Sequence, residues 1–316
     1  MKPIGGFFEL ELPIKKEFHK HAIRLNSARN CFWQFLNVKK PNKVYLPLFT
    51  CDAVINPLVD LNIEYEFYKI DSNLDPNFDF EKLDFHDLFV YNNYMGLKDK
   101  TIEYLKNKLD CNLIIDNAQS FFSRCTSAKT PAFYSPRKFF GVPDGGYLYG
   151  IKKNDMGYLE KQVVYDKMIH LLKRIDISPE TAYPEFIRSE EYFDKLPVRK
   201  MSDFTKRILN SINYNSVKKK RRENFEYLHE NLFKYNDFPD LWDSIQVPLS
   251  YPIYIKSKKI HQKLLDKKIY TPKYWPNVTR WANKNTIEYD YSSNLLHLPI
   301  DQRYRPEDLS RIVKII

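Results

Sequence analysis

Glycine and cysteine are both scarce in this chain. Only 8 of the 316 residues are glycine. Because glycine tolerates backbone conformations that other residues avoid, we expect the adjacent pair Gly145-Gly146 to serve a geometric requirement. The four cysteines form no CxxC pair and no zinc-like spacing, so they predict no metal site and fit thiols in a reducing cytoplasm. They are Cys31, Cys51, Cys111 and Cys125.

Long apolar runs are absent as well. The longest uncharged apolar segments are far shorter than the ~20 residues that a membrane-spanning helix needs. Residues 1–13 include Glu9 and Glu11 and contain no apolar stretch that ends in small residues, so we expect no signal peptide. These absences predict a cytoplasmic protein without a membrane partner.

What is present is typical of a globular protein. Hydrophobic residues make up 43% of the chain and charged residues 28%, and 316 residues suffice for two domains or one large one. The net charge of +10 favours anionic partners. From charge alone, nucleic acid, an acidic membrane surface and a phosphorylated metabolite all remain open.

The first half of the chain predicts an α/β fold. Short apolar segments typical of strands alternate with helical spacing at residues 52–61 and 101–109, which indicates a parallel sheet with crossover helices. The run at 113–115 is apolar throughout and ends at Asp116, as a central strand buried on both faces does. The expected strands are 44–48, 65–70, 88–91, 113–115 and 146–151.

From about residue 155 the pattern changes to long polar helices. We therefore predict a large domain over residues 1–155, interdomain helices over 156–245, and a small α+β domain over 246–316. The expected helices are 158–174, 201–209 and 216–232, followed by strands at 251–255 and 295–300 and helices at 260–265 and from 306.

A basic run lies at residues 218–222. Phe225, Leu228 and Leu232 continue an apolar stripe at helical spacing, so we interpret the run as a solvated helix face. A nucleic-acid patch is the alternative, but the sequence contains no recognisable RNA- or DNA-binding module. We expect no nucleic-acid partner.

Three segments carry candidate chemistry. Lys138 is flanked by aromatic residues, and partial desolvation of its amine would favour Schiff-base formation. A surface lysine lying along apolar side chains has the same pattern. Ser135, three residues earlier, is placed to offer a hydroxyl to a phosphate.

Asp116 ends the most apolar strand, where ligands bind in open α/β sheets. A carboxylate there needs a positive partner, and the pyridinium nitrogen of pyridoxal 5'-phosphate (PLP) is one. Taken alone, Asp116 is equally compatible with a turn or helix cap. Asn26 or Ser27 predicts a helix N-cap, and the free amides of the following turn form a phosphate seat or simply an ordinary capped helix.

These segments occur together, and in the order in which one enzyme family carries them. The chain resembles the DegT-like sugar aminotransferases, a branch of the fold-type I PLP enzymes, nearly from end to end. The matching segments are 26–30 (NSARN), 46–50 (LPLFT), 93–96 (NYMG), 115–119 (IDNAQ), 133–146 around Lys138, 201–203 (MSD) and 297–304 (HLPIDQRY).

The resemblance implies a fold-type I PLP-transferase: a large domain with a mostly parallel central sheet and a smaller α+β C-terminal domain. It implies that PLP is joined to Lys138 as an internal aldimine, with Asp116 against the pyridine nitrogen and Gln119 near the ring hydroxyl. The phosphate would be held by Ser27, Ala28 and Ser135. It also implies a homodimer with the active site at the subunit interface.

The implied reaction is transfer of an amino group from an amino acid, with glutamate as the expected donor, to a nucleotide-linked ketosugar in surface polysaccharide biosynthesis. Two positions depart from the family. Cys51 stands where members carry an aromatic ring, and Arg199 and Lys200 stand where members supply an asparagine to the partner subunit.

Two alternatives follow from the same residues. Relatives that dehydrate sugars replace the lysine with histidine, so Lys138 argues against dehydration. A degenerate protein that binds PLP or a nucleotide-sugar without turnover is the other alternative.

Overall fold

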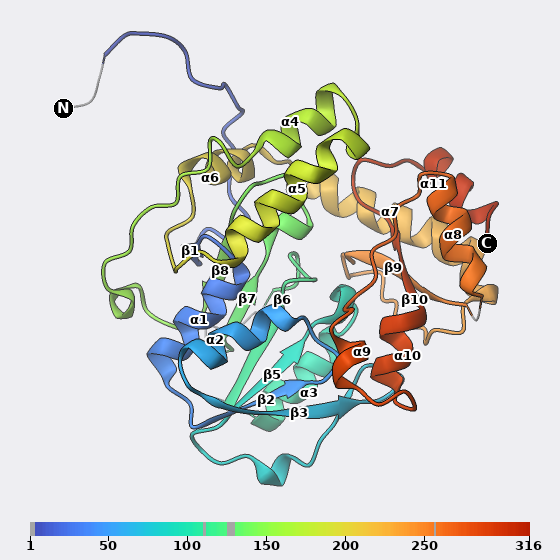
Figure 1. Cartoon of the computed structure of the whole chain (residues 1–316), viewed down its shortest axis with the longest axis horizontal. Coiled ribbons are helices and arrows are strands. Elements are labelled where there is room, and N and C mark those ends of the chain that lie inside the picture. The colour runs from blue at the N-terminus through green and yellow to red at the C-terminus, as the bar shows by residue number, and fades with distance from the viewer. Residues whose placement is uncertain (1–3, 110–111, 125–129, 256) are drawn as a thin grey trace.

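The computed structural model describes residues 4–109, 112–124, 130–255 and 257–316. Its large sheet has the strand order β1-β8-β7-β6-β5-β2-β3-β4, and a small sheet pairs β10 with β9 (Figure 1). The pairs β2–β3, β2–β5, β5–β6 and β6–β7 are parallel, and β1, β4 and β8 run antiparallel to their neighbours. The result is a mixed, mostly parallel α/β sheet.

The elements have the following bounds. The strands are β1 (Ile23–Leu25), β2 (Lys43–Pro47), β3 (Glu64–Ile70), β4 (Pro76–Asn77), β5 (Leu88–Asn92), β6 (Leu113–Asn117), β7 (Ala132–Tyr134), β8 (Gly146–Tyr149), β9 (Ser250–Tyr254) and β10 (Leu295–Pro299). The helices are α1 (Ala28–Lys39), α2 (Ile55–Asp60), α3 (Asp99–Leu109), α4 (Ile169–Asp176), α5 (Pro179–Asp194), α6 (Asp203–Ser211), α7 (Tyr214–Leu232), α8 (Lys258–Asp266), α9 (Val278–Trp281), α10 (Ile287–Asn294) and α11 (Pro306–Val313).

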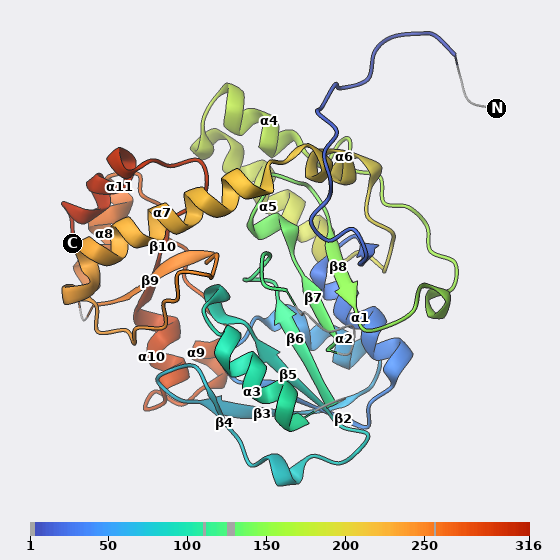
Figure 2. The same cartoon turned by 180° about the vertical axis from the view of Figure 1, so that it is seen from behind.

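The large sheet is covered on both faces. Successive side chains of a strand point to opposite faces, so Ile114 packs with the apolar side of α1, while Leu113 and Ile115 join the core that includes α3. α1 and α2 lie in front of the sheet in Figure 1, and α3 lies in front of it when the molecule is turned in Figure 2. This double coverage explains why β6 is apolar throughout.

The C-terminal part forms a separate layer. The small β9–β10 sheet packs against α7, and α11 also contacts α7 (Figure 1). At the other end of the chain, the first described residues leave the body as an extended arm in both views (Figure 2). None of the described helices has the length and apolar composition that crossing a bilayer requires.

Most expected elements appear near their predicted positions, but the helix expected over 158–174 is wrong. Only α4 forms there, because residues before it run extended: Gln162 N donates to Lys200 O at 2.9 Å, and Lys200 N donates to Glu160 O at 2.8 Å. The sequence prediction also missed α5, which begins with a Ser178 cap and Pro179 at its first position.

Candidate active site

The carboxyl ends of four parallel strands bring the candidate residues to one edge of the sheet. Cys51 follows β2, Asn93 follows β5, Asp116 lies next to the last residue of β6, and Ser135 follows β7. Asp116 is paired in register with Asn92 on one side and with Phe133 on the other. This edge is where open α/β sheets bind their ligands.

Asp116 carries a partly shielded carboxylate. Burial raises its pKa to about 6, although the ammonium of Lys138 and a hydrogen bond from the Ala118 amide both favour the charged form. The Ala118 N–H donates to Asp116 Oδ1 at 2.7 Å. At neutral pH Asp116 is therefore an anion with an electrostatic partner in Lys138.

Lys138 is the last residue of a 3-10 turn, Pro136–Lys138, and its side chain is exposed. Its Nζ lies 5.8 Å from the centre of the Tyr274 ring. The desolvation expected from its aromatic neighbours is not seen, because Phe139 and Phe140 turn inward to pack against Phe121. The amine is therefore accessible to a ligand at this edge.

Gln119 presents a buried donor without an acceptor. Its side-chain oxygen accepts a hydrogen bond from the Met95 amide at 3.0 Å. That bond fixes the orientation of the Gln119 side-chain amide, yet the Nε2 atom of Gln119 is buried and has no partner among the described residues. A buried unpaired N–H is costly, so this position suits an acceptor atom of a ligand.

The start of α1 is held against the glycine pair. Ser27 caps the helix by accepting a hydrogen bond from Asn30 N at 3.1 Å, and Ala28 is its first residue. Gly145 N donates to the backbone oxygen of Asn26 at 2.8 Å, and a Cβ on Gly146 would lie 2.4 Å from Ser27 O. Gly146 is thus required for close backbone approach to the N-terminus of α1, and Gly145 supplies a backbone φ of +124° beside it.

Ser135 reaches the same neighbourhood from β7. It is buried, and its neighbour Pro136 packs so closely on Gly145 that an added Cβ there would lie 2.9 Å from Pro136 Cγ. The glycine pair therefore contacts Ser27 and Ala28 on one side and Pro136, the residue after Ser135, on the other. The pair thus links the start of α1 to the turn that carries Lys138.

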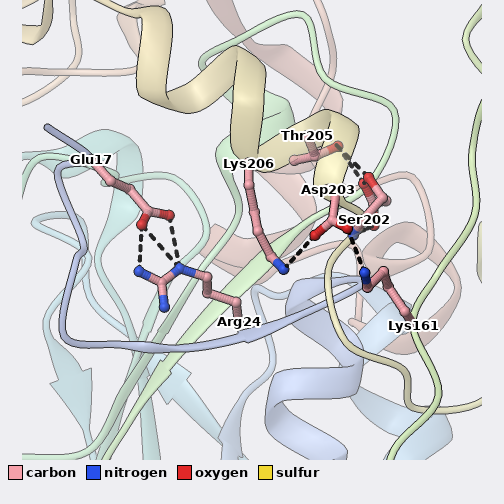
Figure 3. Close-up of polar contacts among 8 residues, drawn as sticks. Glu17, Arg24, Lys161, Ser202, Asp203, Thr205 and Lys206 are labelled. Atoms are coloured by element: carbon pink, nitrogen blue, oxygen red, sulfur yellow. Dashed lines mark hydrogen bonds and ion pairs between the residues drawn. The ribbon is translucent and has the colours of Figure 1, made fainter. Parts of the chain in front are cut away.

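A separate ionic network borders this region. Lys161 and Lys206 both pair with Asp203 at the start of α6, and Arg24 donates three hydrogen bonds to Glu17 (Figure 3). Together these five side chains carry three positive and two negative charges, so every one of them has a partner of opposite sign.

Asp144 is a second buried carboxylate near the glycine pair. It accepts hydrogen bonds from Ser202 N at 2.9 Å, from Ser202 Oγ at 2.7 Å and from the Thr205 hydroxyl. Because all its contacts hold the start of α6, we assign Asp144 a structural role. Arg199 and Lys200 lie close by: the Arg199 guanidinium is 3.4 Å from Glu160 Oε2, and Lys200 is exposed.

Cys51 borders both charged candidates. Burial raises the pKa of its half-buried thiol, the positive charge of Lys138 lowers it, and Asp116 raises it further. Phe49 and Tyr94, two aromatic residues beside this position, are fully buried and pack on Trp275. The side chain that follows β2 and lies near Lys138 is thus the Cys51 thiol and not an aromatic ring. Cys31 is buried, and Cys111 and Cys125 lie outside the described residues.

Two residues at this edge were missed from the sequence. Arg221 belongs to the basic run that was interpreted as a solvated face, yet it is 1% exposed. Its place could have been found, because the apolar positions 225, 228 and 232 continue one turn back to residue 221. Tyr274 had no local signal, since only the fold brings it to Lys138.

Comparison with known proteins gives a consistent result at the level of fold. No protein-family model matches the sequence, and no curated protein is significantly similar to it. Solved structures do match over most of their length. The sugar aminotransferase CalS13 from Micromonospora echinospora has a TM-score of 0.64 at 14% identity, covering 93% of this chain and 86% of that one. The chain has the fold of the sugar aminotransferases.

Two further structures with this sugar aminotransferase fold agree. A DegT DnrJ EryC1 StrS aminotransferase from Brucella abortus has a TM-score of 0.62 at 14% identity, covering 93% of this chain and 84% of that one. NtdA from Bacillus subtilis, with bound cofactor PMP, has a TM-score of 0.63 at 16% identity, covering 93% and 73%. The expected fold class, the α/β fold shared by fold-type I aminotransferase structures, is thereby confirmed.

Proposed function

We propose that this protein is a PLP-dependent aminotransferase that moves an amino group from an amino acid to a nucleotide-linked ketosugar. The observation that carries the proposal is the electrostatic pairing of Asp116 with Lys138 at the carboxyl edge of a sugar aminotransferase fold. A carboxylate and an accessible amine at this edge are the two groups that PLP chemistry requires of a protein.

The residues present fit PLP. The unpartnered Nε2 of Gln119 suits the ring hydroxyl oxygen. The first amides of the 12-residue helix α1, with the helix dipole behind them, suit the phosphate, and the Ser27 hydroxyl caps this helix. We propose that Ser135, which directly precedes the Pro136 that packs on Gly145, adds a second hydroxyl. Asp116 suits the protonated pyridine nitrogen, since a positive partner would compensate its burial.

Bound PLP would supply an electron sink for the carbanion that develops at the substrate carbon. Lys138 would hold the cofactor, and its amine, once released, would serve as general base and acid toward the substrate carbon. Asp116 would face the ring nitrogen and favour its protonated form. The exposure of Lys138 and its position at the end of a short turn are consistent with an amine that can move.

The surroundings follow from the same proposal. We propose glutamate as donor, surface polysaccharide biosynthesis in the cytoplasm as the setting, and a division of the chain at about residues 155 and 245. A homodimer is supported by large apolar side chains that the single chain leaves uncovered. They include Phe7 and Phe8 on the N-terminal arm, 98% and 92% exposed, and Ile175 on α4, 81% exposed.

A two-step experiment tests the function. Protein reconstituted with PLP should gain visible absorbance, which Lys138→Ala should abolish and Lys100→Ala, at a side chain 89% exposed, should leave intact. Adding L-glutamate should then convert the bound cofactor to its amine form, with release of 2-oxoglutarate. Visible absorbance without conversion would indicate a binding protein rather than an aminotransferase.

A further inference from the structure

Arg221 is a buried cation without a counter-ion. It lies on α7 and is 1% exposed, yet no carboxylate of the described residues forms an ion pair with it. Its Nη1 donates to the backbone oxygens of Pro248 and Leu249, both at 3.1 Å, and its Nε is buried without a partner. Burying a charge is expensive unless a partner is present.

One edge of the guanidinium is unused. The Nη1 corner faces the two carbonyls, whereas Nε has no acceptor and no bond from Nη2 is found in the described part of the chain. The Nε–Nη2 edge of arginine is a planar pair of donors that matches the two oxygens of a carboxylate. The open edge of Arg221 therefore has the geometry of a carboxylate receptor.

Arg221 lies next to the candidate catalytic lysine. Its Cζ is 4.6 Å from the centre of the Phe139 ring, and Phe139 directly follows Lys138. Gln302 anchors the same turn by donating from Nε2 to Phe139 O at 2.9 Å. Tyr274, whose ring is 5.8 Å from Lys138 Nζ, also lies within electrostatic range of Arg221.

The charged neighbours of Arg221 do not neutralise it. Asp301 is within electrostatic range, but its carboxylate accepts two hydrogen bonds from the Arg303 guanidinium, at 2.7 and 2.9 Å, and one from the Arg303 amide at 3.1 Å. His297, whose ring is tilted against that of Tyr274 with centres 4.4 Å apart, has a pKa lowered by burial to about 3 and is neutral. Together with Lys138, this region has more positive than negative charge, which favours an anionic ligand.

We propose that Arg221 binds a carboxylate of the amino donor. This inference rests on the proposed function and adds the residue that recognises the donor. Because Arg221 is buried, a neighbouring side chain must move as the donor enters, and the half-buried Tyr274 borders both Arg221 and Lys138. A donor amine at Lys138 and a donor carboxylate at Arg221 would fix the orientation of the reacting carbon between them.

The test compares Arg221→Gln and Arg221→Lys with Arg222→Gln. Arg222 is a matched control because it also donates to backbone oxygens, those of Gln246 and Ile245, but is half-buried. In single-turnover reactions of the PLP-loaded protein with L-glutamate, the half-saturating concentration should rise about 10- to 100-fold in Arg221→Gln, as expected for a lost charge-assisted contact. Arg221→Lys should recover part of the loss, and Arg222→Gln should match the wild type.

Two donor analogues identify which carboxylate is bound. 4-Aminobutyrate lacks the α-carboxylate of glutamate, and L-2-aminobutyrate lacks its distal carboxylate. If Arg221 binds the α-carboxylate, Arg221→Gln should leave the reaction of 4-aminobutyrate unchanged. If Arg221 binds the distal carboxylate, the substitution should leave the reaction of L-2-aminobutyrate unchanged. If both analogues and glutamate respond equally weakly to the substitution, the inference is overturned.

Failure of the inference can be separated from failure of the proposed function. If the wild type gains no visible absorbance with PLP, the function itself is wrong. If it does, and Arg221→Gln saturates normally, only the assignment of Arg221 is wrong. Should Arg221→Gln not fold, a crystal of the PLP-loaded wild type soaked with 2-oxoglutarate decides: a carboxylate on the Arg221 guanidinium supports the inference, and one bound elsewhere refutes it.

Discussion

Replacing Asp116 with asparagine should stabilise the cofactor-free protein. Burial raises the folded-state pKa of Asp116 from 3.8 to about 6. The folded state therefore holds this proton more tightly than the unfolded state, and stability falls as pH rises through this window. Two pKa units correspond to about 3 kcal/mol. Asparagine is neutral at every pH, so Asp116→Asn should raise the free energy of unfolding by up to about 3 kcal/mol at pH 7.5 and by only about 1 kcal/mol at pH 4.5.

Urea unfolding of the cofactor-free protein at the two pH values measures this difference. Asp144→Asn is the control, because Asp144 is a buried carboxylate with three hydrogen-bond donors from Ser202 and Thr205. An amide cannot accept all three, so that variant should lose about 1–3 kcal/mol. The reasoning is refuted if Asp116→Asn destabilises the protein, or if its gain is the same at both pH values.

Two further substitutions test the phosphate seat. Gly146→Ala should destabilise the protein by about 1–3 kcal/mol or more and weaken PLP binding, because the added Cβ would lie 2.4 Å from Ser27 O. The control is Gly141→Ala, whose added Cβ would lie 3.7 Å from its nearest neighbour, and thermal melts should show that it is tolerated. Ser27→Ala and Ser178→Ala both remove a helix cap and should each cost about 1 kcal/mol, but only Ser27→Ala should raise the Kd for PLP in titrations. Equal destabilisation by the two glycine substitutions, or an equal change in the Kd for PLP in the two serine variants, would contradict this placement.

The sequence predicted well what depends on local patterns. The apolar run before Asp116 identified β6, because a strand covered on both faces needs apolar side chains on both. Ser27 was placed correctly at a helix start, because a short hydroxyl side chain can satisfy a free amide of the first turn.

What the sequence did not predict depends on packing between distant segments. The spacing of residues 225, 228 and 232 places residue 221 on the buried face of α7, but only the fold shows that the Arg221 guanidinium packs on the Phe139 ring. Residues 158–168 have apolar positions compatible with a helix, but Lys200 pairs with their backbone and holds them extended. The exposure of Lys138 likewise follows from where Phe139 and Phe140 find their partners.

Reduction with borohydride tests whether PLP forms a covalent bond with Lys138. The protein is incubated with PLP, reduced, digested and examined by peptide mass spectrometry. We predict a pyridoxyl group on the peptide that contains Lys138, and none on that peptide in Lys138→Ala. A wild-type protein whose Lys138 peptide remains unmodified, or that is modified only at surface lysines such as Lys100, would contradict the account.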